Sequence, residues 1–377
     1  MNVLKNILKR ALPKVLLKKA FGLYNLIKIT TIDKVIFPEY KIEFEKFKVY
    51  RTGYPFRENH IDISDLSGTV KEYMNKWYDW TQEEFLLIFD RPCYIEPDFG
   101  WAIIPPNRLL YYSLGISRTW FQPKPSFIKL WKRRIVSDIS VGISLRDSGE
   151  ENYFHFYNDV LSKIFFLKNN SINIESTPLI ISKKLWDKNY FQFYLKNSPK
   201  FQSLNWIVQD KQYIYCRSTI FCKPLTHRVD LYKLIFGGFN LMSHLMRRLY
   251  ITRSRTRLRY IENGSELEDV LKKHKFEIID PDTLTMEDQI KIFSEAAVIV
   301  GIHGAGLTNI YFRNNFCNIL EIFPPPIEGY TPFHYIMLAK MKGFRYNALI
   351  GEKSNNRFSG GFYLSPELLE SNLKLIV

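Results

Sequence analysis

The sequence of 377 residues lacks several features of secreted and membrane-embedded proteins. It has only four cysteines at irregular spacing, so we expect reduced structural thiols rather than a disulfide framework or a zinc site. No stretch approaches the length of an apolar membrane-spanning segment, and lysines interrupt residues 1–32 too often for a signal peptide. These absences predict a cytoplasmic protein without a cleaved leader.

Two common phosphate-binding motifs are also missing. Gly304-Ala305-Gly306 is followed by Asn309 where a dinucleotide fingerprint needs its third glycine, and no Gly-Lys-Ser/Thr follows the loop. A dehydrogenase and a Walker-type nucleotide site are therefore not expected. The segment 280–282, Asp-Pro-Asp, imitates a metal-binding Asp-x-Asp motif, but its place between a strand and a capped helix favours a plain turn, so we predict no metal.

Acidic residues are absent from the amino terminus. Residues 1–32 carry seven lysines and arginines and no acid, out of a formal net charge of +15. Apolar residues recur there at near-helical spacing, interrupted at Pro13, which predicts a basic amphipathic segment. Such a segment either contacts an anionic membrane surface or packs on the domain with its lysines in water.

A second basic cluster lies much later in the chain. Neither cluster belongs to a recognisable nucleic-acid module, so nucleic acid is not an expected partner. The second cluster consists of Arg247, Arg248, Arg253, Arg255, Arg257 and Arg259.

The content of 46% hydrophobic and 16% aromatic residues is typical of a folded protein, and the length favours two domains. We expect the basic segment 1–32, an amino-terminal domain over 33–205 and a carboxyl-terminal domain over 206–377. The strand-forming run 206–222 marks the change between them. The end of the chain is expected to pack back on the first domain.

Strands and helices alternate between residues 249 and 323. Apolar strands are predicted at 249–252, 276–279, 298–300 and 319–323, and capping residues Ser265 and Thr285 open helices between them. This βαβ pattern predicts an α/β fold with a parallel sheet, in which ligands bind beyond the carboxyl ends of the strands. Arg253, His303 and Glu321 fall at or near such ends.

The run 298–309 joins a buried strand to a helix through a glycine-rich turn. Free backbone N–H groups, a helix dipole and the absence of Cβ atoms at Gly304 and Gly306 suit a bound anion, most simply a diphosphate. We expect His303 to point into a cleft rather than into the core.

A helix is predicted from Asn152 to about Leu167, with a buried stripe beside a polar one. His155 and Asp159 lie on the polar stripe four residues apart, as does Lys163. The pair is either a site at the rim of the core or an ordinary solvated or capped pair.

Together these residues resemble glycosyltransferase family 61 over about 145–325. The resemblance rests on Asn152–His155 with Asp159, on the Tyr250–Arg255 block, and on the long block from Phe276 through Asp280-Pro281, Gln289 and 303–309 to Glu321. Thr252 stands where serine is expected, and no match is visible before residue 140.

The resemblance implies a GT-B architecture, in which two Rossmann-like domains with parallel sheets face a central cleft. It also implies an inverting, metal-independent transfer from a nucleotide sugar, here taken as UDP-linked, to a glycan or lipid-linked glycan acceptor. The setting would be capsule or lipopolysaccharide synthesis, in the cytoplasm or peripherally on the inner membrane face. No separate cofactor is implied.

The same resemblance assigns the site residues. His155 or Asp159 would take the proton of the acceptor hydroxyl, and Glu321 would accept hydrogen bonds from ribose. The donor diphosphate would bind the loop N–H groups and Arg253. The donor-binding residues are Arg253, His303, Gly304, Ala305, Gly306, Thr308, Asn309 and Glu321.

Two alternatives remain open at the level of sequence. One is a non-catalytic protein of the same fold that binds membrane or nucleic acid through its basic amino terminus. The other is a pyruvyl- or other group transferase on a similar two-domain fold.

Overall fold

The computed structural model describes residues 35–52, 63–64, 66, 68–79, 81, 83–114, 124–132, 135–147, 149–225, 246–253, 258–329, 333–356 and 360–377. They form two compact units. The amino-terminal unit contains the described parts of 35–52 and 81–225, and the carboxyl-terminal unit those of 63–79 and 246–377. The basic segment 1–32 lies outside the described residues.

The carboxyl-terminal unit is built on a five-stranded parallel sheet in the order β12-β11-β13-β14-β15. All seven residues of β13 are buried, as expected for a strand covered on both faces. The parallel arrangement predicted from the alternating pattern is confirmed. The strands are β11 (Arg247–Ile251), β12 (Glu277–Ile279), β13 (Ala296–Ile302), β14 (Asn318–Phe323) and β15 (Arg345–Ile350).

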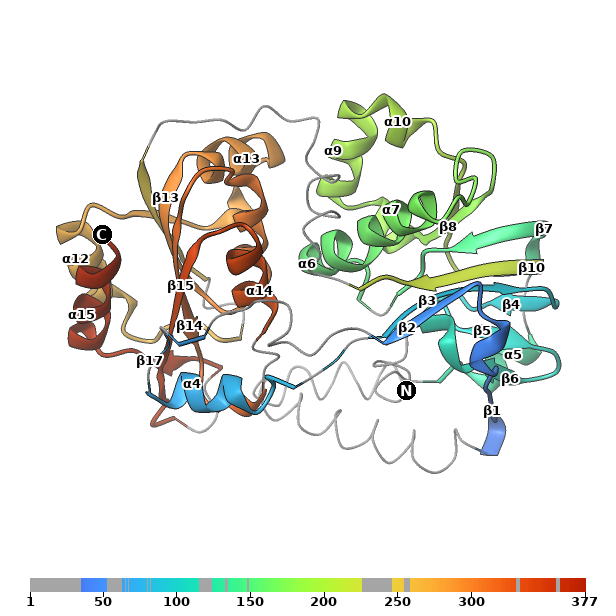
Figure 1. Ribbon diagram of the computed structural model, residues 1–377, viewed down its shortest axis with the longest axis horizontal. Helices are drawn as coiled ribbons and strands as arrows, with labels where there is room; N and C mark the ends of the chain where they lie inside the picture. The colour runs from blue at the N-terminus through green and yellow to red at the C-terminus, as the bar shows by residue number, and fades with distance from the viewer. Residues whose placement is uncertain are drawn as a thin grey trace. The chain divides into compact units, whose positions relative to one another are not determined.

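Helices connect these strands (Figure 1). The Thr285 hydroxyl accepts from the Asp288 N–H (3.1 Å) and caps α13 as predicted, whereas α12 begins at Gly264, one residue before the expected cap. The helices are α4 (Gly68–Asn75), α12 (Gly264–Lys273), η5 (Pro281–Thr283), α13 (Met286–Ser294), η6 (Ala305–Phe312), η7 (Ile327–Gly329), α14 (Phe333–Met341) and α15 (Pro366–Ile376), and the small antiparallel pair is β16 (Glu352–Lys353) with β17 (Phe362–Tyr363).

The strand order creates a switch point beside β11. The chain leaves β11 for β12 on one side and then returns to β13 on the other side, so the crossover helices diverge. Ile251 pairs with Gly301, and the residues that follow these two strands, Arg253 and His303, therefore emerge at the same level. In open α/β sheets this crevice is where ligands bind.

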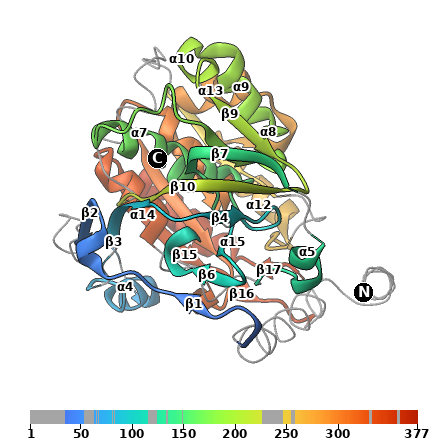
Figure 2. The ribbon, with the colours of Figure 1, turned by 90° about the vertical axis from the view of Figure 1, so that its right-hand side faces the viewer.

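The amino-terminal unit contains a ten-stranded sheet in which β10 occupies the centre. β10 pairs in parallel with β7 and antiparallel with β3 and β4, and in Figure 2 it lies between β7 and β4. The strands are β1 (Glu39–Tyr40), β2 (Val49–Thr52), β3 (Glu83–Phe89), β4 (Cys93–Ile95), β5 (Ala102–Ile104), β6 (Arg108–Leu110), β7 (Ile135–Ser144), β8 (Leu179–Ser182), β9 (Trp206–Gln209) and β10 (Tyr213–Lys223).

This sheet is mixed, which corrects the expectation of a purely parallel one. β7, β8 and β9 run parallel, whereas β4, β5 and β6 pair antiparallel because their connections are too short for crossovers. The helices of this unit are η1 (Phe44–Lys46), η3 (Tyr111–Leu114), α5 (Phe127–Trp131), α6 (Tyr153–His155), the π-helical segment η4 (Phe156–Leu161), α7 (Ser162–Asn169), α8 (Lys183–Trp186), α9 (Asn189–Asn197) and α10 (Pro199–Gln202).

The domain boundaries differ from the prediction in three ways. β9 and β10 complete the amino-terminal sheet, so the division falls after Thr226 rather than before Trp206. The described part of 63–79 belongs to the carboxyl-terminal unit, where the Trp77 ring contacts the Phe333 ring at 6.0 Å. The end of the chain packs within its own unit, because α15 shares a buried core with α12. A strand-forming sequence does not reveal which sheet supplies its hydrogen-bonding partners.

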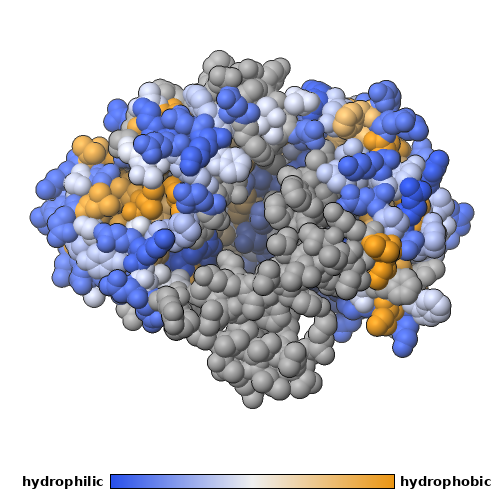
Figure 3. All heavy atoms as spheres, turned by 90° about the horizontal axis from the view of Figure 1, so that it is seen from below, coloured by the Kyte–Doolittle hydropathy of each residue, from blue (hydrophilic) through white to orange (hydrophobic). Residues whose placement is uncertain are grey.

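Within the described residues, no helix has both the length and the apolarity needed to cross a membrane. The face drawn in Figure 3 carries mostly hydrophilic residues, with separate hydrophobic patches. The most exposed large apolar side chains include Ile128 and Trp131 on α5 and Leu375 on α15.

Candidate functional site

The glycine loop, residues 303–306, connects β13 to η6 in the carboxyl-terminal unit. The His303 N–H donates to the Ile322 carbonyl (2.9 Å), and the helix begins at Ala305. It is a 3-10 helix of eight residues rather than an α-helix. Because the N–H groups of a first helical turn have no partner inside the helix, this turn can offer donors to an anion.

Two guanidinium groups converge on the glycine loop. A Cβ atom placed on Gly304 would lie 2.7 Å from Arg253 Nη1 and 3.6 Å from Arg259 Nη2. Arg259 has a φ of 69°, which non-glycine residues rarely adopt, and its N–H donates to the Gly360 carbonyl (2.5 Å). The strained backbone at Arg259 and the absence of a side chain at Gly304 therefore both allow the two guanidinium groups to approach the loop.

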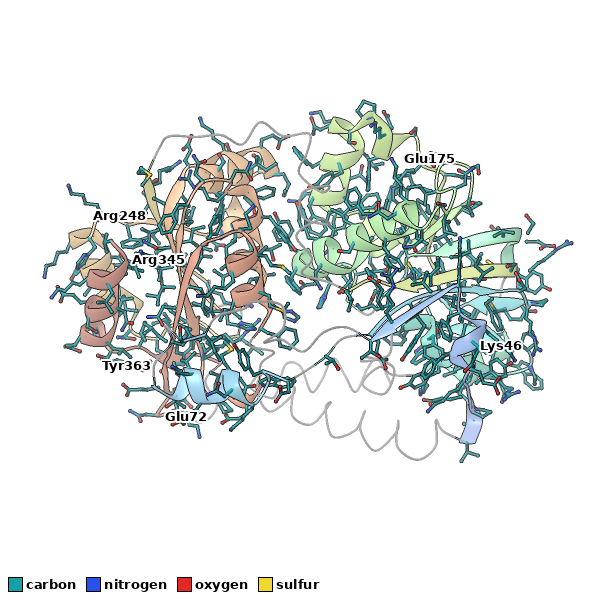
Figure 4. The ribbon with its side chains drawn as sticks, viewed as in Figure 1. Lys46, Glu72, Glu175, Arg248, Arg345 and Tyr363 are labelled. Atoms are coloured by element: carbon teal, nitrogen blue, oxygen red, sulfur yellow. The ribbon has the colours of Figure 1, made fainter. Side chains whose placement is uncertain are left out.

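The sequence cluster of arginines is divided between the two ends of β11. Arg247 forms ion pairs with Glu277 and with Glu295 (3.0 Å). Arg248, labelled in Figure 4, donates to the His274 carbonyl (2.8 Å). These side chains hold the amino-terminal end of the strand. Of the described arginines in the cluster, Arg253 and Arg259 are those beside the glycine loop.

Tyr335 of α14 places an aromatic ring beside this site. Its buried ring packs edge-on against His303, with 5.7 Å between the ring centroids. Burial raises the pKa of the Tyr335 hydroxyl, whereas its hydrogen bond with Thr308 and the nearby charges of Arg253 and Arg259 lower that pKa. Tyr335 therefore lies close to both arginines, and no pattern in the sequence identified it.

His303 and Glu321 form a buried chain with Tyr346. His303 Nδ1 hydrogen-bonds to Glu321 Oε1, and the ring stacks on Phe323 at 5.0 Å. Glu321 is fully buried, and its Oε2 accepts from the Tyr346 hydroxyl (2.5 Å). Glu321 therefore orients His303, of whose side chain 10% is exposed, and both Glu321 oxygens are bound within the protein. The contact of His303 with a donor and that of Glu321 with ribose stay predictions.

Replacing Tyr346 with Phe tests the strength of this chain. The substitution leaves one oxygen of a buried carboxylate without its donor, so we expect the free energy of unfolding to fall by about 1–3 kcal/mol. Burial, followed by the charge of Glu321, raises the pKa of Tyr346, in keeping with its role as a donor. Tyr363→Phe is the matched control in chemical denaturation, because Tyr363 lies on the surface (Figure 4) and should tolerate the change. Equal stability of the two variants would contradict the expectation.

Thr308 and Asn309 belong to the fold rather than to the surface of the site. Both are buried, and Asn309 Nδ2 donates to Gln289 Oε1 (3.0 Å). Gln289 in turn donates to the Pro281 carbonyl (2.9 Å) and fixes the turn after β12. Both residues support the loop through these contacts, and their contact with a donor stays a prediction.

Two other predictions concern the turn at 280–282 and the start of η6. Asp280 accepts from the Asp282 N–H (3.1 Å), so the plain turn predicted there is confirmed. Ala305 and Gly306 are partly exposed at the start of η6, and their contact with a donor stays a prediction.

The second cluster lies in the amino-terminal unit, on the predicted helix. That helix is present, but it consists of α6, the π-helical turn η4 and α7. The Asn152 side chain caps it by accepting from the Phe154 N–H (2.9 Å). π-helical turns are rare and frequently accompany functional sites.

His155 and Asp159 form a hydrogen-bonded pair across this turn. His155 Nδ1 lies 2.7 Å from Asp159 Oδ2, and Asp159 Oδ1 accepts from Lys223 Nζ (2.9 Å). The Asp159 side chain is fully buried, whereas about a quarter of His155 is exposed (26%). The carboxylate fixes the proton on Nδ1, which makes Nε2 the basic nitrogen of the ring. Asp159 is therefore an orienting group, and the ordinary solvated pair is wrong.

Buried charges continue beyond this pair. Lys163 Nζ lies 3.1 Å from Asp147 Oδ2 and donates to the Arg146 carbonyl (2.9 Å). The Arg146 side chain is itself buried and pairs with Glu150 (2.8 Å). No role was assigned from the sequence to Arg146, Asp147 or Glu150. Their position directly after a strand was the available signal.

Gly149 brings this turn against the imidazole. Its φ is 77°, and an added Cβ would lie 3.3 Å from His155 Cδ2. The turn and the helix therefore fix the ring between them.

Comparison with known proteins gives the following matches. The family model Glycosyltransferase 61 matches residues 153–320, which include His155 and Asp159 of one cluster and Arg253 and the glycine loop of the other. A segment of 66 residues is 39% identical to a Beta-1,2-xylosyltransferase of Arabidopsis thaliana, covering 18% of this chain and 12% of that protein. A segment of 100 residues is 31% identical to an EGF domain-specific O-linked N-acetylglucosamine transferase of Drosophila melanogaster, covering 26% of this chain and 18% of that protein. Each match spans less than a fifth of the relative's length.

Proposed function

Residues 153–320 belong to the glycosyltransferase 61 family, and from that premise we propose that the protein transfers a sugar from a nucleotide-sugar donor to a glycan acceptor. The names of the two relatives, a xylosyltransferase and an N-acetylglucosamine transferase, support glycan transfer. We also propose that the donor sugar is linked to UDP.

The convergence of Arg253 and Arg259 on Gly304 is the observation that carries this proposal. Two like charges brought together at a switch point are stabilised by an anion between them, and guanidinium groups bind phosphate oxygens bidentately. The partly exposed first turn of η6 adds backbone donors. A diphosphate has the charge and the spread of oxygens that this arrangement suits.

The reaction then needs no resident metal. The acceptor hydroxyl attacks the anomeric carbon while the bond from that carbon to the diphosphate oxygen breaks, which inverts the configuration. The negative charge that develops on the leaving diphosphate is stabilised by Arg253, Arg259 and the loop N–H groups. The proton of the hydroxyl passes to His155 Nε2, and Asp159 stabilises the imidazolium that forms.

We extend the proposal to architecture and setting. The carboxyl-terminal unit binds the donor and the amino-terminal unit the acceptor, in a GT-B organisation. The acceptor is a surface glycan or lipid-linked glycan of the capsule or lipopolysaccharide type. The basic, acid-free composition of residues 1–32 supports work at an anionic inner membrane face.

Calorimetric titration with UDP, GDP and CDP, followed by hydrolysis assays with the matching nucleotide sugars, tests the proposal. We expect one diphosphate to bind and its sugar nucleotide to be hydrolysed slowly without an acceptor. Absence of binding by every nucleotide diphosphate would overturn the proposal. Binding without turnover, combined with salt-sensitive binding to anionic liposomes, would favour the non-catalytic alternative.

Gly304→Ala tests the geometry of the loop. The new Cβ would meet the Arg253 guanidinium, whose flexible side chain would move away from the anion. We expect the dissociation constant for the diphosphate to rise about tenfold through loss of one charge-assisted contact. Gly264→Ala is the matched control, because a Cβ there has no neighbour within 4 Å. Similar affinities for the two variants would argue against the assigned contact.

A further inference from the structure

Lys223, at the end of β10, is a charged residue that the proposed reaction has not yet used. Its Nζ lies 2.9 Å from Asp159 Oδ1 and 3.9 Å from Asp147 Oδ2. Both carboxylates are fully buried, and only 15% of the lysine side chain is exposed. Lys223 lies 64 residues after Asp159 in the chain, so no local pattern in the sequence could reveal that the two side chains meet.

The two oxygens of Asp159 are divided between two partners. Oδ2 faces the imidazole of His155, and Oδ1 faces the ammonium of Lys223. The Asn158 side-chain amide also donates to Oδ1 (3.2 Å). These donors on Oδ1 fix the plane of the carboxylate. Lys223, on β10, therefore helps to direct Oδ2 toward the imidazole ring.

The buried carboxylates around this pair are opposed by lysines. Asp147 and Asp159 face Lys163 and Lys223. The groups that face this cluster from other elements are themselves paired: Arg146 with Glu150, and Glu84 of β3 with Arg51 (3.9 Å) and with the Leu225 N–H (3.0 Å). Lys223 is therefore the lysine that this cluster directs at Asp159.

We propose that Lys223 is a positioning residue for the transfer reaction, which holds Asp159 as the acceptor for the Nδ1 proton of His155 and so keeps Nε2 directed at the acceptor hydroxyl. The inference rests on the proposed function. Lys223 acts only through Asp159 and is not assigned any contact with substrate.

Removal of the ammonium has a direct physical consequence. The buried oxygen Oδ1 loses its charged donor, so the carboxylate is less firmly oriented. The imidazole that Asp159 holds is then less often placed with Nε2 toward the acceptor hydroxyl, and the rate should fall.

The test uses Lys223→Gln and Lys223→Arg in the full chain, with Lys183→Gln as control. Lys183 forms an exposed pair with Asp187 at 2.8 Å, so its substitution removes the same charge without reaching the site. We expect Lys223→Gln to lower kcat about tenfold near neutral pH, with the KM for donor unchanged. Lys223→Arg should recover most of the rate.

A loss of kcat that arginine does not relieve, or that comes with an equal rise in the KM for donor, would overturn the proposal. Unchanged kcat in Lys223→Gln would do the same. Thermal unfolding of each variant separates a folding defect from a positioning defect, and the arginine variant keeps the question decidable if the glutamine variant does not fold.

A second measurement separates this inference from the proposed function. Long-range proton–nitrogen NMR of labelled imidazoles, assigned with His155→Gln, reports the tautomer of His155 without any turnover. We expect the Nδ1–H tautomer in the natural protein and a mixture in Lys223→Gln. If the natural protein transfers no sugar but shows this change, the function fails and the positioning stands. If it is active and the tautomer is the same in both proteins, the positioning fails alone.

Discussion

Replacing Arg253 with alanine is expected to abolish measurable binding of the nucleotide diphosphate at micromolar concentrations. The guanidinium lies closest to Gly304, where the proposal puts the phosphates. Loss of a charge-assisted, bidentate contact should raise the dissociation constant about ten- to a hundredfold. Arg253→Lys should recover only part of the affinity, since an ammonium cannot reproduce the fork of donors. Isothermal titration at fixed, moderate ionic strength measures the effect.

The control for Arg253 must remove the same charge elsewhere. Arg345 begins β15, is exposed, and lies over the Phe316 ring at 5.6 Å (Figure 4). Arg345→Ala should bind the diphosphate as the natural protein does. If both variants lose affinity equally, the effect comes from net charge and the site is wrong. Arg259→Ala should fall between the two, because its guanidinium lies farther from Gly304.

Replacing His155 with alanine is expected to lower kcat about 10²- to 10⁴-fold, which is the usual contribution of a general base. The affinity for the diphosphate should not change, because the residues assigned to the donor belong to the other unit. Asp159→Asn should cause a loss of similar order, since an amide does not hold the ring in the same tautomer. Steady-state kinetics with an accepted donor and acceptor provide the measurement.

His274→Ala is the matched control for this loss. His274 ends α12, and its Nε2 lies 3.8 Å from Glu370 on α15, so it serves the packing of two helices. Its substitution should leave kcat unchanged. Full activity of His155→Ala would remove the base from the mechanism, whatever the outcome for Arg253.

The parts of the site that the sequence predicted are those encoded within one short segment. The strand, glycine loop and helix of residues 298–312 depend on neighbouring residues, and so does the pair His155 and Asp159 on one helix. The parallel direction of the carboxyl-terminal strands followed from the helices predicted between them. The position of Arg253 at the end of its strand was also predicted from the sequence.

The parts that the sequence missed depend on partners distant along the chain. Glu321 was assigned to ribose because it lies near a strand end, but Tyr346 on the adjacent strand binds its second oxygen. Lys223 reaches Asp159 from a strand assigned to the wrong domain. Burial was the other unseen quantity. Thr308 and Asn309 follow the loop directly, yet the 3-10 helix turns them into the core.

The π-helical turn between α6 and α7 has a consequence for the way this helix tolerates change in length. Such a turn holds one residue more than an α-helical turn, so the extra residue is accommodated within the turn itself. Deletion of a single residue within 156–161 would allow a regular α-helical turn, with α6 and α7 keeping their relative orientation. The same deletion within α7 would instead rotate every later side chain of that helix by about 100°. The π-helical turn is therefore the part of this helix where the loss of one residue displaces the fewest side chains.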